Sequence, residues 1–301
     1  MLFVPTGLKY NWVWSNVETL RPVVTATNFG DAVTVNLSTT TYGAWTNLAT
    51  SAEVAYDVYG ILICLNNYAA SNAIRNALFN IGVDNAGGTS YRVVIPALIG
   101  GSSSPYYLGS GGIWYYFPLF IPAGSSIAVQ AKGTAASTTA GCAIWLYGQP
   151  DQPELVKTGS IVAALGIDDA NNRGSTITMG TTADGTWLNL GLNGVAPYAG
   201  KFDFSNVGPP WWVQCGFAQN DASMTAAAIH CDVAIGTATQ KVLILEDQLW
   251  TVTAAEQIAS NCYFNGYTRV YNGISGNEVW VRAQSSSASD TGPGMAVYMM
   301  F

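Results

Sequence analysis

Apolar and polar residues alternate through residues 121–148, IPAGSSIAVQAKGTAASTTAGCAIWLYG, in a pattern that predicts two β-strands. A turn at Gly124 leads into a strand in which Ile127, Val129 and Ala131 alternate with other residues. A loop of small residues follows, and a second strand of apolar and aromatic residues ends the segment. We expect the two strands to form a hairpin.

The same pattern returns at the C-terminus in residues 274–301, ISGNEVWVRAQSSSASDTGPGMAVYMMF. The aligned positions have similar residues and are Gly124 with Gly276, Ile127 with Val279, Val129 with Val281, Ala131 with Ala283, Ala143 with Ala296, and Ile144 with Val297. This recurrence predicts that one supersecondary unit occurs twice, as the product of an internal duplication.

Other segments pair in the same order along the two halves. They are GAWTNL (43–48) with GTWLNL (185–190), VAYDVYGILICL (54–65) with WWVQCGF (211–217), and YRVVIPAL (91–98) with KVLILEDQL (241–249). The second of these pairs places Cys64 opposite Cys215. Residues 72–84 fit a helix or a strand equally well, but their counterpart AIHCDVAIG (228–236) alternates cleanly, so we predict strands for both.

About eight short strands per copy, separated by turns rich in Gly, Asn and Ser, predict an all-β fold. We expect two tandem, internally duplicated jelly-roll domains, each a β-sandwich, with an immunoglobulin-like sandwich as the alternative. The predicted parts are an N-terminal arm (1–20), a first domain (21–148), a linker (149–159) and a second domain (160–301). The arm has no counterpart in the second half, and it either packs over its own domain or docks on a neighbouring subunit.

The composition and the net charge make some classes of function less plausible than others. Charged residues make up 10% of the chain, against about 25% in an average domain. We therefore expect much of the outer surface to be buried in an assembly. The net charge of −7 and the lack of a Lys/Arg cluster argue against a nucleic-acid partner. The chain start lacks the pattern of a signal peptide, and no apolar run is long enough to span a membrane.

Candidate catalytic and metal-binding residues are few. The single histidine, His230, is predicted to share the outward face of its strand with Asp232, while Cys231 points the other way, which opposes a Cys–His dyad. The run Asp168-Asp169-Ala170-Asn171-Asn172-Arg173-Gly174 departs from a calcium-loop pattern, and we predict an Asx-rich turn. The five cysteines have no metal-site spacing and suit reduced thiols in a reducing cytoplasm. We predict no catalytic site, no metal and no cofactor.

Aromatic residues are abundant, with 10 Trp and 16 Tyr. Adjacent aromatics on one strand, such as Trp211-Trp212, cannot both point inward, so one member of each pair should face outward. Exposed aromatics suit a protein interface or stacking on sugar rings, and interfaces are the more common use. The candidate interface residues are Tyr10, Trp12, Trp14, Trp211 and Trp212.

Residues 121–148 resemble a segment found in structural proteins of tailed bacteriophages. The first copy has Pro122-Ala123-Gly124-Ser125 and Gln130-Ala131. The second has Gly276, Arg282-Ala283-Gln284 and an SSSAS run, but Ser275 stands in place of the proline. The resemblance covers about a fifth of the chain. It implies a β-sandwich building block on a capsid or tail, with no active site to carry over.

Together these patterns predict a non-enzymatic virion structural protein, assembled in the host cytoplasm. The first hypothesis is a capsid decoration or cement protein that bridges neighbouring shell subunits. Its partners would be the major capsid protein or other virion proteins, and we expect a homo-oligomer without nucleic acid or membrane. The alternative is a tail-associated receptor-binding protein that recognises cell-surface glycans through exposed aromatics. A third hypothesis, a polysaccharide-cleaving enzyme, would need a pair of acids in a groove.

Overall fold

The chain is all-β in the computed structural model, as the alternation predicts. The structure describes residues 13–14, 31–36, 40–66, 76–100, 113–133, 139–148, 158–160, 162–191, 210–218, 227–254, 257–259, 278–287 and 294–300. Within them the only helical turn is a short 3-10 helix, Asp169–Asn171. No helix in these ranges is long and apolar enough to cross a membrane.

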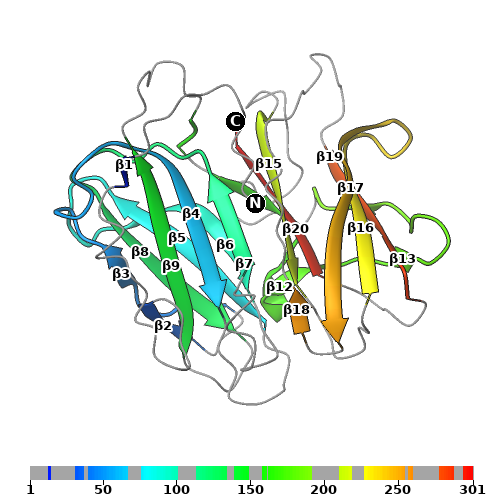
Figure 1. The fold of residues 1–301 in the computed structure, drawn as a ribbon, viewed down its shortest axis with the longest axis horizontal. Coiled ribbons are helices and arrows are strands. Elements are labelled where there is room, and N and C mark those ends of the chain that lie inside the picture. The colour runs from blue at the N-terminus through cyan, green and yellow to red at the C-terminus, as the bar shows by residue number, and fades with distance from the viewer. Residues whose placement is uncertain are drawn as a thin grey trace.

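The first half contains strands β1 to β9, which form one nine-stranded sheet. Their bounds are β1 Val13–Trp14, β2 Asp31–Asn36, β3 Thr46–Ala49, β4 Val58–Asn66, β5 Ala77–Asp84, β6 Arg92–Gly100, β7 Ile113–Phe117, β8 Ser126–Gly133 and β9 Thr139–Gly148. The order is β6-β5-β8-β2-β9-β4-β7, with β3 on β8 and β1 on β9. Figure 1 shows β4 and β9 in front of β5 and β8.

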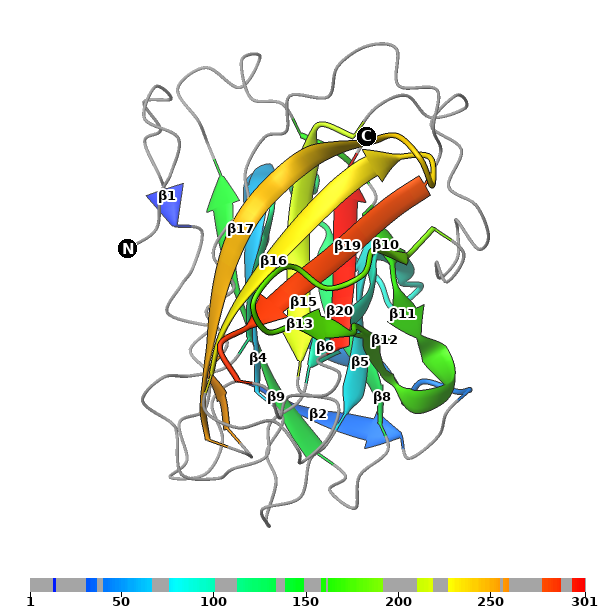
Figure 2. The same cartoon turned by 90° about the vertical axis from the view of Figure 1, so that its right-hand side faces the viewer.

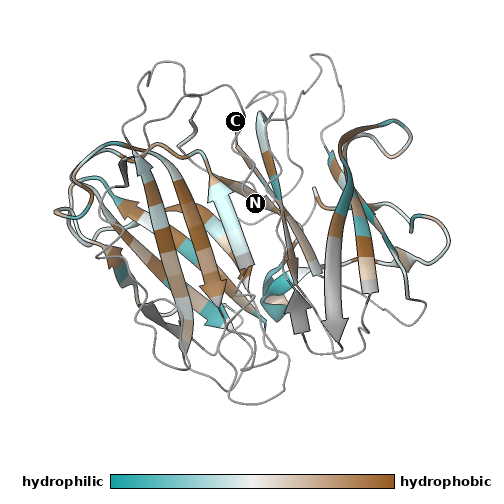
Figure 3. Cartoon of the chain, viewed as in Figure 1, coloured by the Kyte–Doolittle hydropathy of each residue, from teal (hydrophilic) through white to brown (hydrophobic). Residues whose placement is uncertain are grey.

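Strand β2 joins the two wings of this sheet, which are β6, β5, β8 and β3 on one side and β9, β4, β7 and β1 on the other. Asp31–Thr34 pair with β9 in antiparallel fashion, and Val35 and Asn36 then pair with β8 in parallel. Both wings bury apolar residues in the same cluster, for example Ile63 from β4 and Ile81 from β5. The sheet is therefore folded over a shared core as a sandwich, and the apolar bands of its strands are visible in Figure 3.

The second half contains β10 to β20, in two sheets. Their bounds are β10 Ala163–Leu165, β11 Ile167–Asp168, β12 Arg173–Thr176, β13 Met179–Gly180, β14 Leu188–Asn189, β15 Trp212–Ala218, β16 Ala227–Gly236, β17 Lys241–Ala254, β18 Gln257–Ala259, β19 Glu278–Ser285 and β20 Gly294–Met300. One sheet has the order β10-β20-β12-β11, with β15 on β20. The other has the order β13-β19-β16-β17-β18, with β14 on β19, and lies farthest from the first half (Figure 1).

The two halves share their strand pairing at aligned positions. Phe79 of β5 pairs with Ala131 of β8, and the aligned Cys231 of β16 pairs with Ala283 of β19. Likewise β4 pairs with β9 as β15 pairs with β20. This common register supports the similarity read from the sequence, while the duplication event and the jelly-roll connectivity stay predictions.

The predicted hairpins are wrong. Strand β8 pairs with β2, β3 and β5, whereas β9 pairs with β1, β2 and β4. Strands β19 and β20 likewise belong to different sheets. The loop between β8 and β9 thus connects the two wings of the first sheet, and the loop between β19 and β20 connects two different sheets. A hairpin has the same local sequence pattern, two strands and a short loop, so the sequence could not distinguish the two arrangements.

The predicted equivalence of Cys64 and Cys215 is also wrong by one residue. Cys64 pairs with Ala143, but Ala296, the residue aligned with Ala143, pairs with Gly216. Cys215 belongs to the central apolar cluster, whereas Cys64 is buried outside it. A one-residue slip in a strand moves a side chain to the opposite face of the sheet, so the two cysteines have different surroundings.

Candidate functional site

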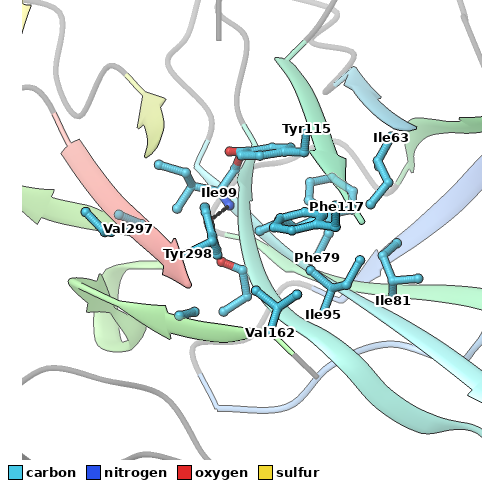
Figure 4. Close-up of a cluster of buried hydrophobic side chains, with 14 of the residues drawn as sticks. Ile63, Phe79, Ile81, Ile95, Ile99, Tyr115, Phe117, Val162, Val297 and Tyr298 are labelled. Atoms are coloured by element: carbon cyan, nitrogen blue, oxygen red, sulfur yellow. Dashed lines mark hydrogen bonds between the residues drawn. The ribbon is translucent and has the colours of Figure 1, made fainter. Parts of the chain in front are cut away.

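The two halves of the chain meet at a junction where buried residues of both belong to one hydrophobic cluster. Tyr298 of β20 is fully buried against β6, where its hydroxyl accepts a hydrogen bond from the Ile99 N–H (2.8 Å) and donates one to the Ala97 carbonyl (3.0 Å). The hydroxyl of Tyr115 donates to the Ile99 carbonyl (2.6 Å). Figure 4 shows Tyr115 and Tyr298 on either side of Ile99. These phenols satisfy the outer edge of β6 without adding another strand.

Strand β15 fits closely against the same place. The Gln214 carboxamide accepts a hydrogen bond from the Tyr116 N–H (3.0 Å). A Cβ atom added to Gly216 would lie 2.7 Å from the Tyr115 hydroxyl and 2.9 Å from Cγ1 of Ile99. Close packing at a glycine and buried polar contacts together indicate a permanent intramolecular interface.

The expectation that one of Trp211 and Trp212 faces outward is wrong. Trp211 is 7% exposed and Trp212 is 4% exposed, and Trp212 packs edge-on against Tyr116 with ring centroids 5.7 Å apart. Alternation correctly places the two rings on opposite sides, but both sides of this strand are covered by the chain itself. Little of either ring is left for another protein.

The remaining interface candidates lie in the arm. Tyr10 and Trp12 lie outside the described residues, and of Trp14 only the strand position is described. In β1, Val13 pairs with Gly148 and Trp14 with Tyr147 of β9. At this point the arm adds a strand to its own half. The last residue of the predicted linker, Gly159, is held by backbone hydrogen bonds with Pro118 and Phe120.

The acidic run 168–174 forms a turn, and one of its residues contacts the first half of the chain. The Asp168 carboxylate accepts hydrogen bonds from Asn171 (2.8 Å) and from Arg173 (3.1 Å). These bonds stabilise the turn. Asp169 forms an ion pair with Lys132 of β8 (2.7 Å), whose side chain is 1% exposed. Within the described ranges, no three His, Cys, Asp or Glu side chains are grouped to hold a metal ion.

The outer strand β17 differs from its counterpart β6. Ile99 pairs with Leu78 of β5, and Leu249 pairs with His230 at the aligned place in β16. Ile99 is 0% exposed and Leu249 is 42% exposed. Five apolar residues of β17 are exposed or half-buried, and we call them the β17 surface, namely Val242, Leu243, Ile244, Leu245 and Leu249. Figure 2 shows β17 at the edge of the layer that faces the viewer.

Both outer strands carry the same β-bulge. Ala97 of β6 has φ 49° and Asp247 of β17 has φ 51°, a left-handed conformation that is rare outside glycine. The Ala97 N–H donates to the side-chain oxygen of Asn80 (2.8 Å), and the Asp247 N–H donates to the carboxylate of Asp232 (2.9 Å). Each strained residue is thus held by a side chain from the neighbouring strand.

A cluster of aromatic and charged side chains lies on the outer side of β16 and β19. We call it the tryptophan face; it contains Trp187, Trp280, Lys241, Arg282 and Asp184. The Lys241 ammonium lies 4.3 Å from the ring centre of Trp280, and the Arg282 guanidinium lies 4.6 Å from that of Trp187. Arg282 also pairs with Asp184 (2.8 Å) and Asp232 (2.7 Å). These contacts fix two half-buried indoles at the surface.

His230 and Cys231 point to opposite sides of β16, as predicted. His230 is exposed, with its Nδ1 atom 3.8 Å from Oδ1 of Asp247, while Cys231 is fully buried. Burial raises the pKa of the Cys231 thiol, and it raises the pKa of Cys64 to about 12. Neutral thiols packed in apolar surroundings serve as small core residues and not as nucleophiles.

Sequence reasoning missed the β17 surface. The pattern VLIL in residues 242–245 looks like any buried strand, so exposure could not be read from it. One signal was present, since the acidic pair Glu246-Asp247 stands where the first half has Pro96-Ala97. Charges in the middle of an apolar strand indicate contact with solvent or a polar partner.

No protein-family model matches the chain, and no curated protein matches it. Solved structures with distant similarity include a Parabacteroides distasonis protein described as secreted (9% identity, 98% of each chain, TM-score 0.25). Another is peptide: N-glycanase F (10% identity, 90% of this chain and 95% of that chain, TM-score 0.27). A third is the empty top component of cowpea mosaic virus (11% identity, 94% and 92%, TM-score 0.26). These TM-scores are too low to support an argument about function.

Proposed function

We propose that this protein is a non-enzymatic structural component of a virion, a decoration or cement protein that adheres to the capsid of a tailed bacteriophage. The observation that carries the proposal is the β17 surface, where Val242, Leu243 and Leu249 are exposed, whereas the equivalent strand β6 is buried from Val94 to Gly100. An exposed apolar strand of this kind marks a contact with another protein.

The chemistry of the described residues agrees with adhesion. The buried carboxylate of Asp232 is occupied by Arg282 and by the Asp247 N–H, so it is not held ready as a general acid or base. The net charge of −7 disfavours binding to a nucleic acid, and the low share of charged residues suits a protein whose surface is partly covered in an assembly.

The test is reconstitution on particles assembled without this protein. The purified full chain should co-sediment with such particles and add density to the outer shell in an electron-microscopy map. Bovine serum albumin at the same concentration controls for trapping in the pellet. Failure to co-sediment with heads, combined with binding to tails or to cells, would overturn the capsid assignment.

The tryptophan face favours a second candidate, a receptor-binding protein that recognises glycans. Two half-buried indoles bordered by Arg282 and Asp184 offer stacking surfaces beside polar groups, which is how sugar rings are bound. Glycan-array binding by the full chain that is lost in Trp187→Ala, and kept in Trp45→Ala, would favour this function. Trp45 is a suitable control because it occupies the aligned motif and packs on Tyr91.

A further inference from the structure

The pairing of β17 determines which of its side chains share a side of the sheet. Leu243 pairs with Ala234 of β16, and Leu249 pairs with His230. Residues paired across neighbouring strands point to the same side, so both leucines lie on the outer side, where the tryptophan face also lies. Leu243 is 40% exposed, Leu249 is 42% exposed, and the Asp247 side chain between them in the sequence is 72% exposed. This side of the sheet thus presents apolar residues beside an acidic one.

The aligned side of the first half shows how such a surface is bound within the chain. Leu78 of β5 pairs with Lys132 of β8 and with Ile99 of β6, and all three are buried. In the second half, Leu249 occupies the place of Ile99 in this row. The second half contacts the row through Asp169, which pairs with the Lys132 ammonium (2.7 Å). The internal contact therefore combines apolar burial with one lysine–aspartate ion pair.

A partner of the β17 surface needs a positive charge. Contact between two β17 surfaces would bring Glu246 and Asp247 of both copies together, and like charges repel each other. Apolar side chains beside a lysine or arginine would instead repeat the chemistry of the internal contact. Four cations of the described ranges are already engaged within the chain, and they are Lys132, Arg173, Lys241 and Arg282. Each of these four would have to leave an existing contact to reach a partner.

Residues 1–12, MLFVPTGLKYNW, have the required chemistry, and we call them the leading segment. Lys9 is the only charged side chain in this segment, and no acid occurs in the sequence before residue 18. Leu8 and Tyr10 flank the lysine, and the apolar run Leu2-Phe3-Val4 precedes it. The segment thus combines apolar residues with one cation, which complements the apolar residues and the two acids of β17.

We propose that the leading segment of one copy binds the β17 surface of a second copy. Lys9 pairs with Glu246 and Asp247, and the apolar residues of the segment pack on Leu243 and Leu249. This inference rests on the proposed function and names a partner for its adhesive surface. The contact is heterologous, since a different part of the chain is used on each copy.

The position of β1 favours a second copy over the same copy. Tyr147 of β9 pairs with Trp14 of β1 on one side and with Gly60 of β4 on the other, so β9 lies between β1 and β4. Strand β7 follows β4 and is the strand that contacts β15 of the second half. Figure 1 accordingly shows β1 and β17 in opposite halves of the molecule. Twelve residues extend at most about 40 Å, which is ample for a contact with a neighbouring copy.

Exchange of charges between two variants tests the contact. Lys9→Glu and Glu246→Lys each place like charges across it, both in the full chain. By sedimentation velocity the wild type should form dimers or larger species whose share rises with concentration, and each variant alone should remain largely monomeric. An equimolar mixture should associate again, because the reversed charge of one variant meets the reversed charge of the other. A mixture that stays monomeric while the wild type associates would overturn the proposal.

Two further variants separate charge from apolar contact. Arg92→Glu reverses an exposed cation at the start of β6, and it should associate like the wild type. Leu249→Asp should lose self-association, but it should form dimers with Lys9→Glu, because its own leading segment is intact and so is the β17 surface of the other variant. Unchanged thermal unfolding in each variant would show that the fold is retained.

A photoreactive phenylalanine analogue in place of Leu249 locates the contact directly. In a mixture of copies with and without ¹⁵N, crosslinks should join position 249 of one copy to residues 1–12 of the other. Crosslinks confined to a single copy, or crosslinks to residues 241–249 of a second copy, would contradict the proposal.

The outcomes also distinguish this inference from the proposed function. A wild type that is monomeric at every concentration and on particles would overturn the contact between copies. If that monomer still decorates capsids, the proposed function stands without the contact. Copies that crosslink as expected but bind no particles would overturn the proposed function and leave the contact in place.

Discussion

The bulge between β5 and β6 and the bulge between β16 and β17 have the same backbone conformation but differ in charge. Neutral side chains support the first bulge, and charged side chains support the second. In the first, Asn80 holds Ala97 and lies opposite Gln130 of β8. In the second, Asp232 holds Asp247 and lies opposite Arg282 of β19. A neutral amide pair in one half thus corresponds to an ion pair in the other.

The difference in charge follows from the side chains that surround each bulge. The second half buries β6, where an unpaired charge would be costly, and amides satisfy the N–H at a smaller desolvation cost. Asp232 is buried as well, but its carboxylate is paired with Arg282 and accepts the Asp247 N–H, and these contacts offset the cost of burying the charge. The backbone geometry is common to both halves, while the charge of its support follows the surroundings of each.

We expect the largest effect from a charge placed at the bulge between β5 and β6. Asn80→Asp keeps the oxygen that accepts the Ala97 N–H but adds a buried carboxylate, and the cation on the same face of β8, Lys132, is already paired with Asp169. We expect the free energy of unfolding to fall by about 3–5 kcal/mol, as for other uncompensated buried charges. Urea unfolding at pH 7 measures this change, and the loss should shrink at a pH low enough to protonate the new carboxyl.

The reciprocal change is the control. Asp232→Asn keeps the acceptor for the Asp247 N–H, and Arg282 retains Asp184 as a partner. The expected loss is about 1.5–3 kcal/mol, the range for hydrogen bonds to a charged group, because Arg282 loses the carboxylate oxygen that accepts from its Nε (2.8 Å) and Nη2 (2.7 Å) atoms. Equal losses in the two variants would show that a paired cation does not decide the charge at the bulge.

Truncation of aligned residues in β6 and β17 sharpens the contrast in burial. Ile99→Ala removes a side chain from a fully packed site and should cost about 2–4 kcal/mol. Leu249→Ala removes a side chain that is 42% exposed and should cost less than about 1 kcal/mol in the monomer. Thermal unfolding at low protein concentration measures both, and similar shifts would contradict the assigned exposure of β17.

Removal of one hydroxyl tests the junction by itself. Tyr298→Phe leaves the Ile99 N–H and the Ala97 carbonyl without their buried partner and should cost about 1–3 kcal/mol. Tyr91→Phe is a matched control, since its hydroxyl accepts only an exposed hydrogen bond from Asn47. We expect a change within about 0.5 kcal/mol for the control.

The smallest effect concerns Cys64 of β4, which is buried between Trp114 of β7 and Ala143 of β9 in the sheet. Its pKa is raised to about 12 by burial, so the folded protein favours the neutral thiol. The associated stability is complete below the ordinary thiol pKa near 9 and declines as the pH rises toward 12. Labelling with iodoacetamide at pH 8 should therefore modify Cys64 only after unfolding. Rapid labelling of the native protein, mapped by mass spectrometry, would contradict this.

The all-β fold and the inward-facing positions of aligned strands could be predicted because alternation with a period of two is a local property. Phe79 and Cys231 were aligned from sequence, and both take the same place in their ladders. Which strands pair depends on how the chain crosses between sheets, so the hairpins were predicted wrongly. The position of Cys64 was one residue out for a related reason, since alternation gives faces but not register.

The surfaces could not be predicted to the same degree. Trp211 and Trp212 alternate as expected, yet the contact of one half with the other covers both. The burial of Ile99 and the exposure of Leu249 likewise depend on the neighbour of each strand and not on its own residues. A surface created or removed by contact between domains is a tertiary property that no single segment encodes.

The bond between Tyr298 and β6 has a consequence for synthesis on the ribosome. Tyr298 covers the edge of a strand that is translated some two hundred residues earlier. The apolar edge of β6 in the nascent N-terminal half is therefore unprotected until β20 has been translated. During that interval a chaperone or a neighbouring nascent chain can reach the edge. A premature stop before β20 would leave it open permanently, which makes truncated products prone to aggregation.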